Sequence, residues 1–341
     1  MERIRLGIVG VGHLGRFHVK VAREIDCIEV VGIYDIDPKR LEEISREFSV
    51  IAFEDMDSLL ELCDAVSIVV PTHSHFSVAR EAIGRGIHVF IEKPLTSTVE
   101  EGKLLVEMAR EKGIKLQVGH IERFNPAFLS LKGIKLSPMF VEAHRLARFH
   151  PRGLDVSVIL DLMIHDIDIV LTLIPYPLCS LHACGVPVIS ASEDIANVRM
   201  EFENGAVANL TASRISAKDM RKMRLFQKDQ YISIDFLEKK SEIFSLEGVD
   251  ALREEGFSVT SLGEIGISPL KRTIYMVHPP RVEINSLKME LGEFARSILL
   301  DLEEVVSGEQ ALYSLEVAHR ILREIKRPDS YLREGDLTSK G

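Results

Sequence analysis

The sequence predicts a two-domain protein: an α/β domain on a doubly wound parallel sheet, followed by an α+β domain with one large, mostly antiparallel sheet. Apolar strands alternate with amphipathic helices up to about residue 119, the pattern of a parallel sheet covered by helices. Beyond it, runs of strands are followed by helices, as in α+β domains. The 341 residues, 46% of them hydrophobic, suffice for two cores, so we expect domains at residues 1–121 and 122–341.

The chain begins with a short apolar strand that enters a glycine-rich turn, with the sequence IRLGIVGVGHLG at residues 4–15. Gly10, Gly12 and Gly15 match the pattern G-x-G-x-x-G, which makes a tight turn and lets the backbone approach a pyrophosphate. The next helix, expected at residues 14–25, would direct its N-terminal N–H groups and positive dipole end at the phosphates.

A second apolar strand, residues 29–34, ends at Asp35, which lies 20 positions after Gly15. A carboxylate at this position accepts hydrogen bonds from the adenosine ribose hydroxyls. The combination predicts a Rossmann dinucleotide-binding domain, against the alternative of a plain βαβ unit with a solvated Asp35. Asp35 would repel a 2′-phosphate, so we expect NAD and regard NADP as less favoured, although Lys39 and Arg40 weaken this preference.

The rest of this domain follows in regular order. We expect helices at residues 38–48 and 58–63, a helix ending at residue 85 and one at residues 98–112, with strands at residues 65–70, 87–91 and 115–119. In an open α/β sheet, ligands bind outside the carboxyl ends of the strands. The residues expected to bind the cofactor at this edge are Gly10, Val11, Gly12, His13, Leu14, Gly15, Asp35, Pro71, Thr72, His75, Glu92, Lys93, Pro94 and His120. An alternative role for Thr72 or Ser74 is to cap the helix that follows.

In the second domain, the sequence ERFNPAF opens a helix, and a long apolar helix is expected at residues 157–173. Asn204-Gly205 between two alternating runs predicts a hairpin turn. Further expected elements are strands at residues 139–148, 221–227 and 231–236 and helices at residues 286–306 and 309–326. Few helices are left to cover the sheet, so we expect a homodimer or homotetramer formed through it.

The long apolar helix carries Asp161, His165 and Asp168 at spacings that place them on one face. An acid one turn before a histidine can fix its tautomer and raise its basicity, which favours a general acid/base over a core histidine with capping carboxylates. Asp161 and His165 alone do not make a metal site, because no third hard ligand is evident. We therefore expect no metal.

Lys93 follows a strand end directly, between Glu92 and Pro94. A lysine beside a cofactor can stabilise the oxyanion that develops when an alcohol gives up hydride, or can relay its proton, whereas the alternative is a surface lysine in a turn. We predict Lys93, Asp161 and His165 as catalytic residues. The predicted substrate-binding residues are Lys93, Arg123, Asn125, Arg145, Asp161 and His165, with Arg148 a weaker candidate.

Composition limits the partners. The net charge of −10 and the pI near 5.7 argue against nucleic acid and anionic membrane surfaces. No apolar run reaches the 18 or so residues of a membrane span, and no cleavable signal precedes the first strand. The four cysteines lack C-x-x-C spacing, as in reduced thiols. These features predict a cytoplasmic protein.

With GIVGVGHLG, VPTHSH, FIEKP and DLMIHDID in this order, the chain resembles the glucose–fructose oxidoreductase, inositol dehydrogenase and rhizopine catabolism (Gfo/Idh/MocA) family over essentially its whole length. The resemblance implies a Rossmann domain before an α/β sheet domain, and oxidation of sugar or cyclitol hydroxyls with NAD(P). It also implies that Lys93 and His165 line the reacting alcohol, with Asp161 close by.

Within this family, QVGHIERFNPA at residues 117–127 and the apolar Asp-His helix resemble the nucleotide-sugar 3-dehydrogenases, which act on UDP-N-acetylglucosamine or its uronic acid. Their 3-keto product passes to an aminotransferase. Residues 155–158, DVSV, replace the glycines that many relatives have before that helix, which affects the shape of the pocket. The alternatives are an inositol or free-sugar dehydrogenase, a non-catalytic NAD-binding sensor, and a hydrolase or epimerase that uses tightly bound NAD transiently.

Overall fold

The computed structural model describes residues 2–150, 156–246, 249–254, 256–266 and 271–325, in two compact units. The first unit contains Met1–Leu129 and Val282–Glu316, and the second contains Ser130–Arg281 and Val317–Gly341. This division differs from the predicted one, which placed everything after residue 121 in the second domain.

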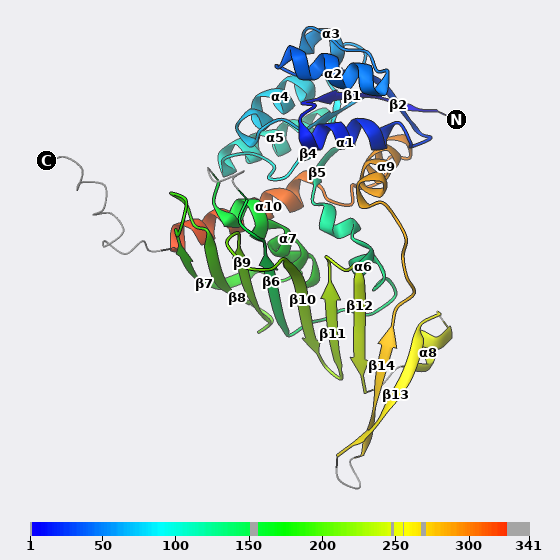
Figure 1. The fold of residues 1–341 in the computed structure, drawn as a ribbon, viewed down its shortest axis with the longest axis vertical. Helices are drawn as coiled ribbons and strands as arrows, with labels where there is room; N and C mark the ends of the chain where they lie inside the picture. The colour runs from blue at the N-terminus through cyan, green and yellow to red at the C-terminus, as the bar shows by residue number, and fades with distance from the viewer. Residues whose placement is uncertain (1, 151–155, 247–248, 255, 267–270, 326–341) are drawn as a thin grey trace, which may run out of the picture. The chain divides into compact units, whose positions relative to one another are not determined.

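The first unit is built on a five-stranded parallel sheet with the strand order β2-β1-β3-β4-β5 (Figure 1). Its strands are β1 (Ile4–Val9), β2 (Ile28–Tyr34), β3 (Ala65–Ile68), β4 (His88–Glu92) and β5 (Leu116–Gly119). All four residues of β3 and of β5 are buried, as expected for strands covered on both faces. The predicted doubly wound α/β domain is therefore confirmed.

Side chains cap the starts of several helices of this unit. They are α1 (His13–Ala22), α2 (Pro38–Phe48), α3 (Met56–Leu60), α4 (Thr72–Gly84) and α5 (Val99–Lys112). The Asp37 side chain caps α2 by accepting from the backbone N–H groups of Lys39 and Arg40. Thr98 and Glu101 form a capping box at the start of α5.

A late segment of the chain returns to the first unit. Helix α9 (Ser286–Leu299) buries Leu287, Leu291 and Phe294 in the same core cluster as β1 and α1, and the Phe294 ring lies 5.8 Å from that of Phe90. Helix α10 (Gly308–Glu324) follows. Hydrophobic periodicity predicts that α9 is amphipathic but does not say which core it covers, which is why the predicted domain boundary missed this return. The short elements η1 (Ile121–Phe124) and α6 (Pro126–Leu129) close the N-terminal part.

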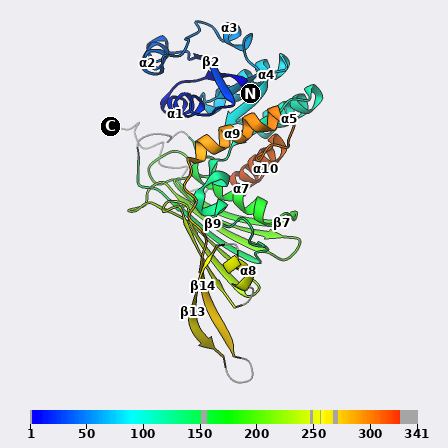
Figure 2. The same ribbon diagram turned by 90° about the vertical axis from the view of Figure 1, so that its right-hand side faces the viewer.

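The second unit is built on a nine-stranded sheet with the order β13-β14-β12-β11-β10-β6-β9-β8-β7 (Figures 1 and 2). Its neighbours are antiparallel except for the parallel pair β6 and β9, which confirms the predicted mostly antiparallel sheet. The predicted Asn204-Gly205 hairpin joins β8 to β9, and Gly205 has a φ of 80°. The strands are β6 (Phe140–Leu146), β7 (Leu178–Val186), β8 (Ile195–Phe202), β9 (Val207–Ser213), β10 (Met220–Gln227), β11 (Gln230–Asp235), β12 (Lys240–Ser245), β13 (Ser258–Ile265) and β14 (Arg272–His278).

The two faces of this sheet differ in burial. Along β6, Val141, Ala143 and Arg145 are buried and the residues between them are partly exposed. The buried face lies against η2 (Ile159–Met163) and α7 (Ile164–Leu173). The predicted single α-helix over residues 157–173 is thus a π-helical turn that continues into an α-helix.

Strands β13 and β14 extend beyond the other strands, with the short helix α8 (Val249–Glu254) before them (Figures 1 and 2). The pairing of β12 with β14 covers only three residues of each strand. The sequence analysis named no strand here, because β13 is almost wholly exposed and so lacks the apolar alternation that marks a strand. A bulge between Ser261 and Gly263, which has a φ of 114°, further breaks the pattern.

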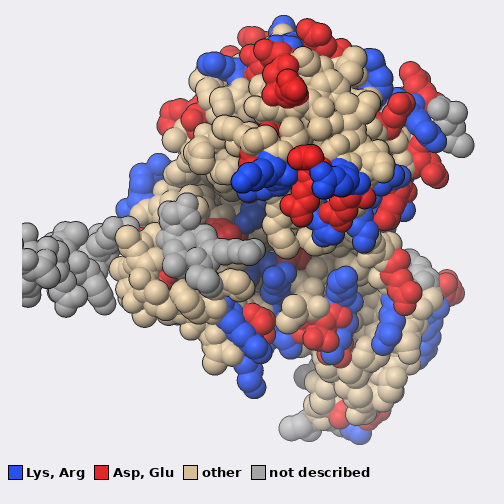
Figure 3. Space-filling view, turned by 45° about the horizontal axis from the view of Figure 1, so that its top comes forward, with Lys and Arg blue, Asp and Glu red and all other residues tan. Residues whose placement is uncertain are grey.

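Charged side chains of both signs are interspersed on the face drawn in Figure 3, so that face has no large basic surface. Within the described ranges, none of the helices combines the length and apolarity needed to cross a bilayer.

Candidate active site

The glycine-rich turn fits a pyrophosphate. Gly10 has a φ of 89°, and a Cβ there would lie 2.7 Å from the backbone carbonyl of Val69. A Cβ on Gly15 would meet the Gly10 oxygen at 2.0 Å, so chain packing requires glycine at both positions. Around Gly12 the nearest atom to such a Cβ is Arg40 Nη1, 4.0 Å away. The backbone at Gly12 therefore borders open space at the start of α1, where no side chain caps the helix and its N–H groups can receive phosphate oxygens.

Asp35 follows β2 and is buried, with its carboxylate beside the glycine-rich turn. Its Oδ2 accepts from the Val11 N–H at 2.8 Å, and its Oδ1 accepts from the Asp37 N–H at 2.9 Å. Arg40 Nη1 lies 3.5 Å from Oδ1. The residue predicted to bind the ribose therefore also holds the turn in place.

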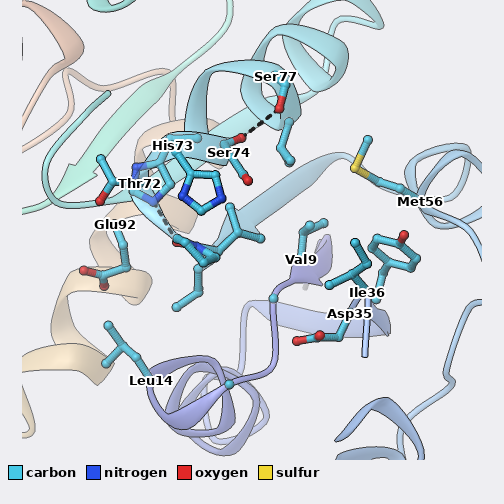
Figure 4. Close-up of a pocket in the computed structure, with 18 of the residues that line it drawn as sticks. Val9, Leu14, Asp35, Ile36, Met56, Thr72, His73, Ser74, Ser77 and Glu92 are labelled. Carbon is cyan, nitrogen blue, oxygen red and sulfur yellow. Dashed lines mark hydrogen bonds between the residues drawn. The ribbon is translucent and has the colours of Figure 1, made fainter. Parts of the chain in front are cut away.

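Residues at the carboxyl ends of β1 to β4 line a cavity of about 690 Å³ (Figure 4). This volume is within the usual range of ligand sites. Among the residues predicted to bind the cofactor, the cavity is lined by Gly10, Gly12, Leu14, Asp35, Pro71, Thr72, His75, Glu92 and Lys93, whereas its lining does not include Val11, His13, Gly15, Pro94 and His120. The fit of loop, carboxylate and cavity supports a dinucleotide, and the individual contacts stay predictions.

The sequence analysis did not assign apolar lining residues next to Asp35. Ile36 is 90% exposed and lines the cavity together with Tyr34 and Met56. Exposed apolar side chains beside a ribose-binding carboxylate suit the faces of an adenine ring. The signal in the sequence is an isoleucine directly after the acidic residue that ends β2.

His75 holds the turn that contains Lys93. Its Nδ1 lies 2.9 Å from the Pro94 carbonyl oxygen and its Nε2 lies 2.9 Å from that of Val70. Burial lowers the pKa of His75, and the hydrogen bonds to the two carbonyls oppose that effect. Both ring nitrogens lie beside backbone carbonyl oxygens, and the neutral ring can donate to one of them, which favours a positioning role for His75 over a direct contact with the cofactor.

The predicted acid/base pair lies at the junction of two helix types. Asp161 belongs to the π-helical turn η2 and His165 to the first turn of α7, and both side chains are partly exposed. Asp168, which was predicted on the same face, is buried. π-Helical turns occur frequently at functional sites, so this local geometry supports the choice of Asp161 and His165.

The helix that carries these residues is anchored at its start. Arg214 Nη2 donates to the Val156 carbonyl oxygen, just before η2, and the Val158 N–H donates to the backbone carbonyl oxygen of Glu193 at 3.0 Å. Arg214 also lies near the buried Asp194 carboxylate, with Nε 3.8 Å from Oδ1. The π-helical turn therefore starts from a fixed backbone.

Three predicted substrate-binding residues are buried in structural contacts. Arg145 makes a bidentate pair with Asp166 at 2.9 and 2.8 Å, which joins β6 to α7. Arg123 Nη1 donates to the Val305 carbonyl oxygen at 3.3 Å and to Gln310 Oε1 at 3.1 Å. Asn125 accepts from the Ala127 N–H and so caps α6. These contacts favour structural roles, and substrate binding by the three residues stays a prediction.

His18 is a residue that the sequence analysis missed. It lies on the buried face of α1 and contacts Ser67 and Glu92. The available signal was a histidine at a core position, three residues after Gly15. Within the described residues, no group of three or more His, Cys, Asp or Glu side chains is arranged to hold a metal ion.

Comparison with known proteins identifies the family. A family model described as "Oxidoreductase family, NAD-binding Rossmann fold" matches residues 4–120, and one described as "GFO/IDH/MocA C-terminal domain" matches residues 137–233. The chain belongs to the Gfo/Idh/MocA family. It is thus an oxidoreductase with a site for a nicotinamide cofactor.

Two relatives within the Gfo/Idh/MocA family bear on its activity. The chain is 41% identical over 261 residues to UDP-N-acetylglucosamine 3-dehydrogenase of Acidithiobacillus ferrooxidans, across 75% of this chain and 83% of that protein. A solved structure of that dehydrogenase superposes with a TM-score of 0.84 and 34% identity, across 95% of this chain and 98% of its own. The NAD(+)-dependent scyllo-inositol 2-dehydrogenase of Bacillus subtilis is 30% identical, across 63% of this chain and 68% of that protein.

Proposed function

We propose that the protein oxidises the C3 hydroxyl of UDP-N-acetylglucosamine, or of its uronic acid, with NAD. The observation that carries the proposal is the similarity, over most of the chain, to the UDP-N-acetylglucosamine 3-dehydrogenase of Acidithiobacillus ferrooxidans. The presence in this chain of Lys93, Asp161 and His165 supports it, because these residue types supply the acid/base and charge-stabilising groups that alcohol oxidation needs.

In the proposed reaction, His165 takes the proton of the sugar C3 hydroxyl while the C3–H bond breaks. Bound NAD supplies the hydride acceptor at nicotinamide C4. Asp161, one turn before His165, is the carboxylate that would fix the imidazole tautomer. The Lys93 ammonium stabilises negative charge on the oxygen as the carbonyl forms. Lys93 lines the cofactor cavity in the first unit, while Asp161 and His165 belong to the second.

We assign NAD rather than NADP because the buried Asp35 carboxylate would repel a 2′-phosphate. The nearby Arg40 opposes this preference, since its guanidinium lies 3.5 Å from Asp35 and could pair with a phosphate. We place the enzyme in the cytoplasm, where its four free thiols stay reduced.

We also propose that copies of the chain associate through the exposed face of the large sheet. Opposite α7, an aromatic row crosses four strands: Phe140, Phe226, Tyr231 and Phe244, with ring centroids 5.0 to 5.7 Å apart. Phe226 is 38% exposed. An apolar row of this length on a sheet face favours burial against a second copy. Sedimentation of the wild type and of Phe226→Glu tests this, and a wild-type monomer would contradict it.

The activity is tested by NADH absorbance after mixing pure protein and NAD with UDP-N-acetylglucosamine, its uronic acid, myo-inositol or glucose, with and without 2-oxoglutarate. NADH formation with a UDP-sugar, but with neither myo-inositol nor glucose, supports the proposal. NADH formation with myo-inositol would instead favour an inositol dehydrogenase, the alternative that the similarity to scyllo-inositol 2-dehydrogenase supports. Cofactor binding without turnover of any of the four would point to an NAD-binding sensor or to internal redox cycling.

A further inference from the structure

Three polar groups form a chain of contacts beneath the cofactor cavity. His18 Nδ1, on α1, lies 2.9 Å from Ser67 Oγ, on β3. The same ring's Nε2 lies 3.1 Å from Glu92 Oε1, at the end of β4. His18 and Ser67 are fully buried, whereas the Glu92 side chain is 13% exposed and lines the cavity. These contacts therefore link the interior of the first unit to the wall of the cofactor site.

The chemistry of the partners fixes the ring of His18. An ionised carboxylate can only accept hydrogen bonds, so His18 Nε2 carries the proton that is donated to Glu92. In the neutral imidazole, Nδ1 then accepts from the Ser67 hydroxyl. The ring also packs edge-on against Phe90, with centroids 5.7 Å apart. Both the tautomer and the orientation of His18 are thus determined.

The Glu92 carboxylate is held on its remaining sides as well. Its Oε2 accepts from the Lys93 N–H at 3.3 Å. A Cβ on Gly119 would come within 2.9 Å of Glu92 Oε1, so a larger residue there would displace the carboxylate from this position. An apolar residue in place of His18 would fill the same core without the cost of burying polar atoms. The polar contacts therefore serve to position Glu92.

The cavity gives Glu92 a position relative to the dinucleotide. Asp35 marks the adenosine ribose and the glycine-rich turn marks the pyrophosphate. Figure 4 shows Glu92 and Asp35 on opposite sides of the cavity. Glu92 therefore lies toward the nicotinamide half, beside the catalytic candidate Lys93.

We propose that His18 and Ser67 are positioning residues that orient the Glu92 carboxylate to accept from the ribose hydroxyls of the nicotinamide half of the cofactor. This inference rests on the proposed dinucleotide site and extends it to two residues that do not touch the ligand. It predicts that changes at His18 weaken the binding of a whole dinucleotide without weakening the binding of its adenosine half.

The experiment compares the affinities of NADH and ADP, measured by calorimetry on the folded full-length protein. For His18→Leu we expect the Kd of NADH to rise about tenfold, the size of a lost hydrogen bond to a charged group, while the Kd of ADP stays the same. His18→Gln keeps a donor that can reach Glu92 and should restore most of the NADH affinity. Val19→Ala is the matched control, because Val19 is an equally buried neighbour on α1 and is not one of the residues that contact Glu92 as described above.

An unchanged ratio of the two Kd values in His18→Leu, or an equal change in Val19→Ala, would show that His18 is only a core residue. If His18→Leu fails to fold, Ser67→Ala replaces it, and we expect a smaller rise in the Kd of NADH in the same direction. An unchanged Kd in that variant would overturn the proposal. Failure of the wild type to bind NADH would overturn the proposed cofactor, and the positioning role with it.

Discussion

The Oδ2 atom of Asp35 accepts a hydrogen bond from the Val11 N–H at 2.8 Å. One carboxylate thereby fixes the glycine-rich turn and faces the expected ribose. We predict that Asp35 binds the cofactor as well, and kinetic measurements with NAD and NADP can distinguish this predicted role from the structural one.

Replacement of Asp35 should change the cofactor preference. In Asp35→Ala, we expect kcat/KM with NAD to fall about 10- to 100-fold through the lost hydrogen bonds to the ribose. The value with NADP should fall less or rise, because the repulsion of the 2′-phosphate is removed and Arg40 can pair with it. Steady-state kinetics with both cofactors gives the ratio.

The control for this prediction is the double variant Asp35→Ala with Arg40→Ala. Its kcat/KM with NADP should be lower than that of Asp35→Ala, because Arg40 is no longer there to pair with the 2′-phosphate. An equal fall with both cofactors in Asp35→Ala would mean that the residue acts only through its bond to the Val11 N–H.

Loss of the acid/base group should reduce turnover without reducing cofactor binding. We expect His165→Gln and Lys93→Met each to lower kcat by about 10²- to 10⁴-fold, the usual contribution of a positioned acid/base or charge-stabilising group. NADH binding, followed by fluorescence, should be kept in His165→Gln. His182→Ala is the control, since His182 is exposed on β7. Full turnover in either catalytic variant would remove that residue from the mechanism.

Removal of Arg145 should lower the stability of the fold, rather than weaken substrate binding directly. Arg145→Met leaves Asp166 buried and without its bidentate partner, so we expect a loss of about 3–5 kcal/mol in the free energy of unfolding. Adding Asp166→Leu should recover much of that loss, because a buried ion pair can be replaced by apolar residues at little cost. Urea unfolding measures both.

A comparison with Arg199→Met, which removes an exposed pair with Glu201, should show a change below about 1 kcal/mol. If Arg145→Met instead raises the KM of the sugar and leaves unfolding unchanged, Arg145 is a substrate ligand, as first predicted.

The sequence was sufficient for those features that depend on local periodicity and turn chemistry. The parallel sheet, the α2 helix at residues 38–48, the Asn204-Gly205 hairpin and the cavity edge all follow from them. The return of α9 depends on a packing partner distant in the sequence, and the π-helical turn at Asp161 depends on tertiary contacts, so neither has a periodic signal.

The site shows the same contrast. Glycines and the acid after β2 have a fixed spacing, and so they could be assigned from the sequence. Arg145 looked like a candidate ligand because its charge is visible in the sequence, whereas its buried partner Asp166 is not adjacent to it. His18 was missed because its partners Ser67 and Glu92 also lie on other elements.

Acid should remove one specific contribution to stability, that of Asp194. Burial raises the pKa of this carboxyl, but hydrogen bonds from the backbone N–H groups of Ile189, Ser190 and Val188 outweigh it and lower the pKa from 3.8 to about 2. Because the folded state has the lower pKa, it binds fewer protons than the unfolded chain, and the charged form stabilises folding by about 2 kcal/mol. This contribution is present above about pH 4 and is lost as the pH falls toward about 2.

Asp194→Asn has no charge to lose, so the difference in unfolding free energy between it and the wild type should shrink below about pH 4 in urea titrations. The exposed Asp250→Asn is the control, and a difference for Asp194→Asn that is independent of pH would mean that the carboxylate charge makes no contribution.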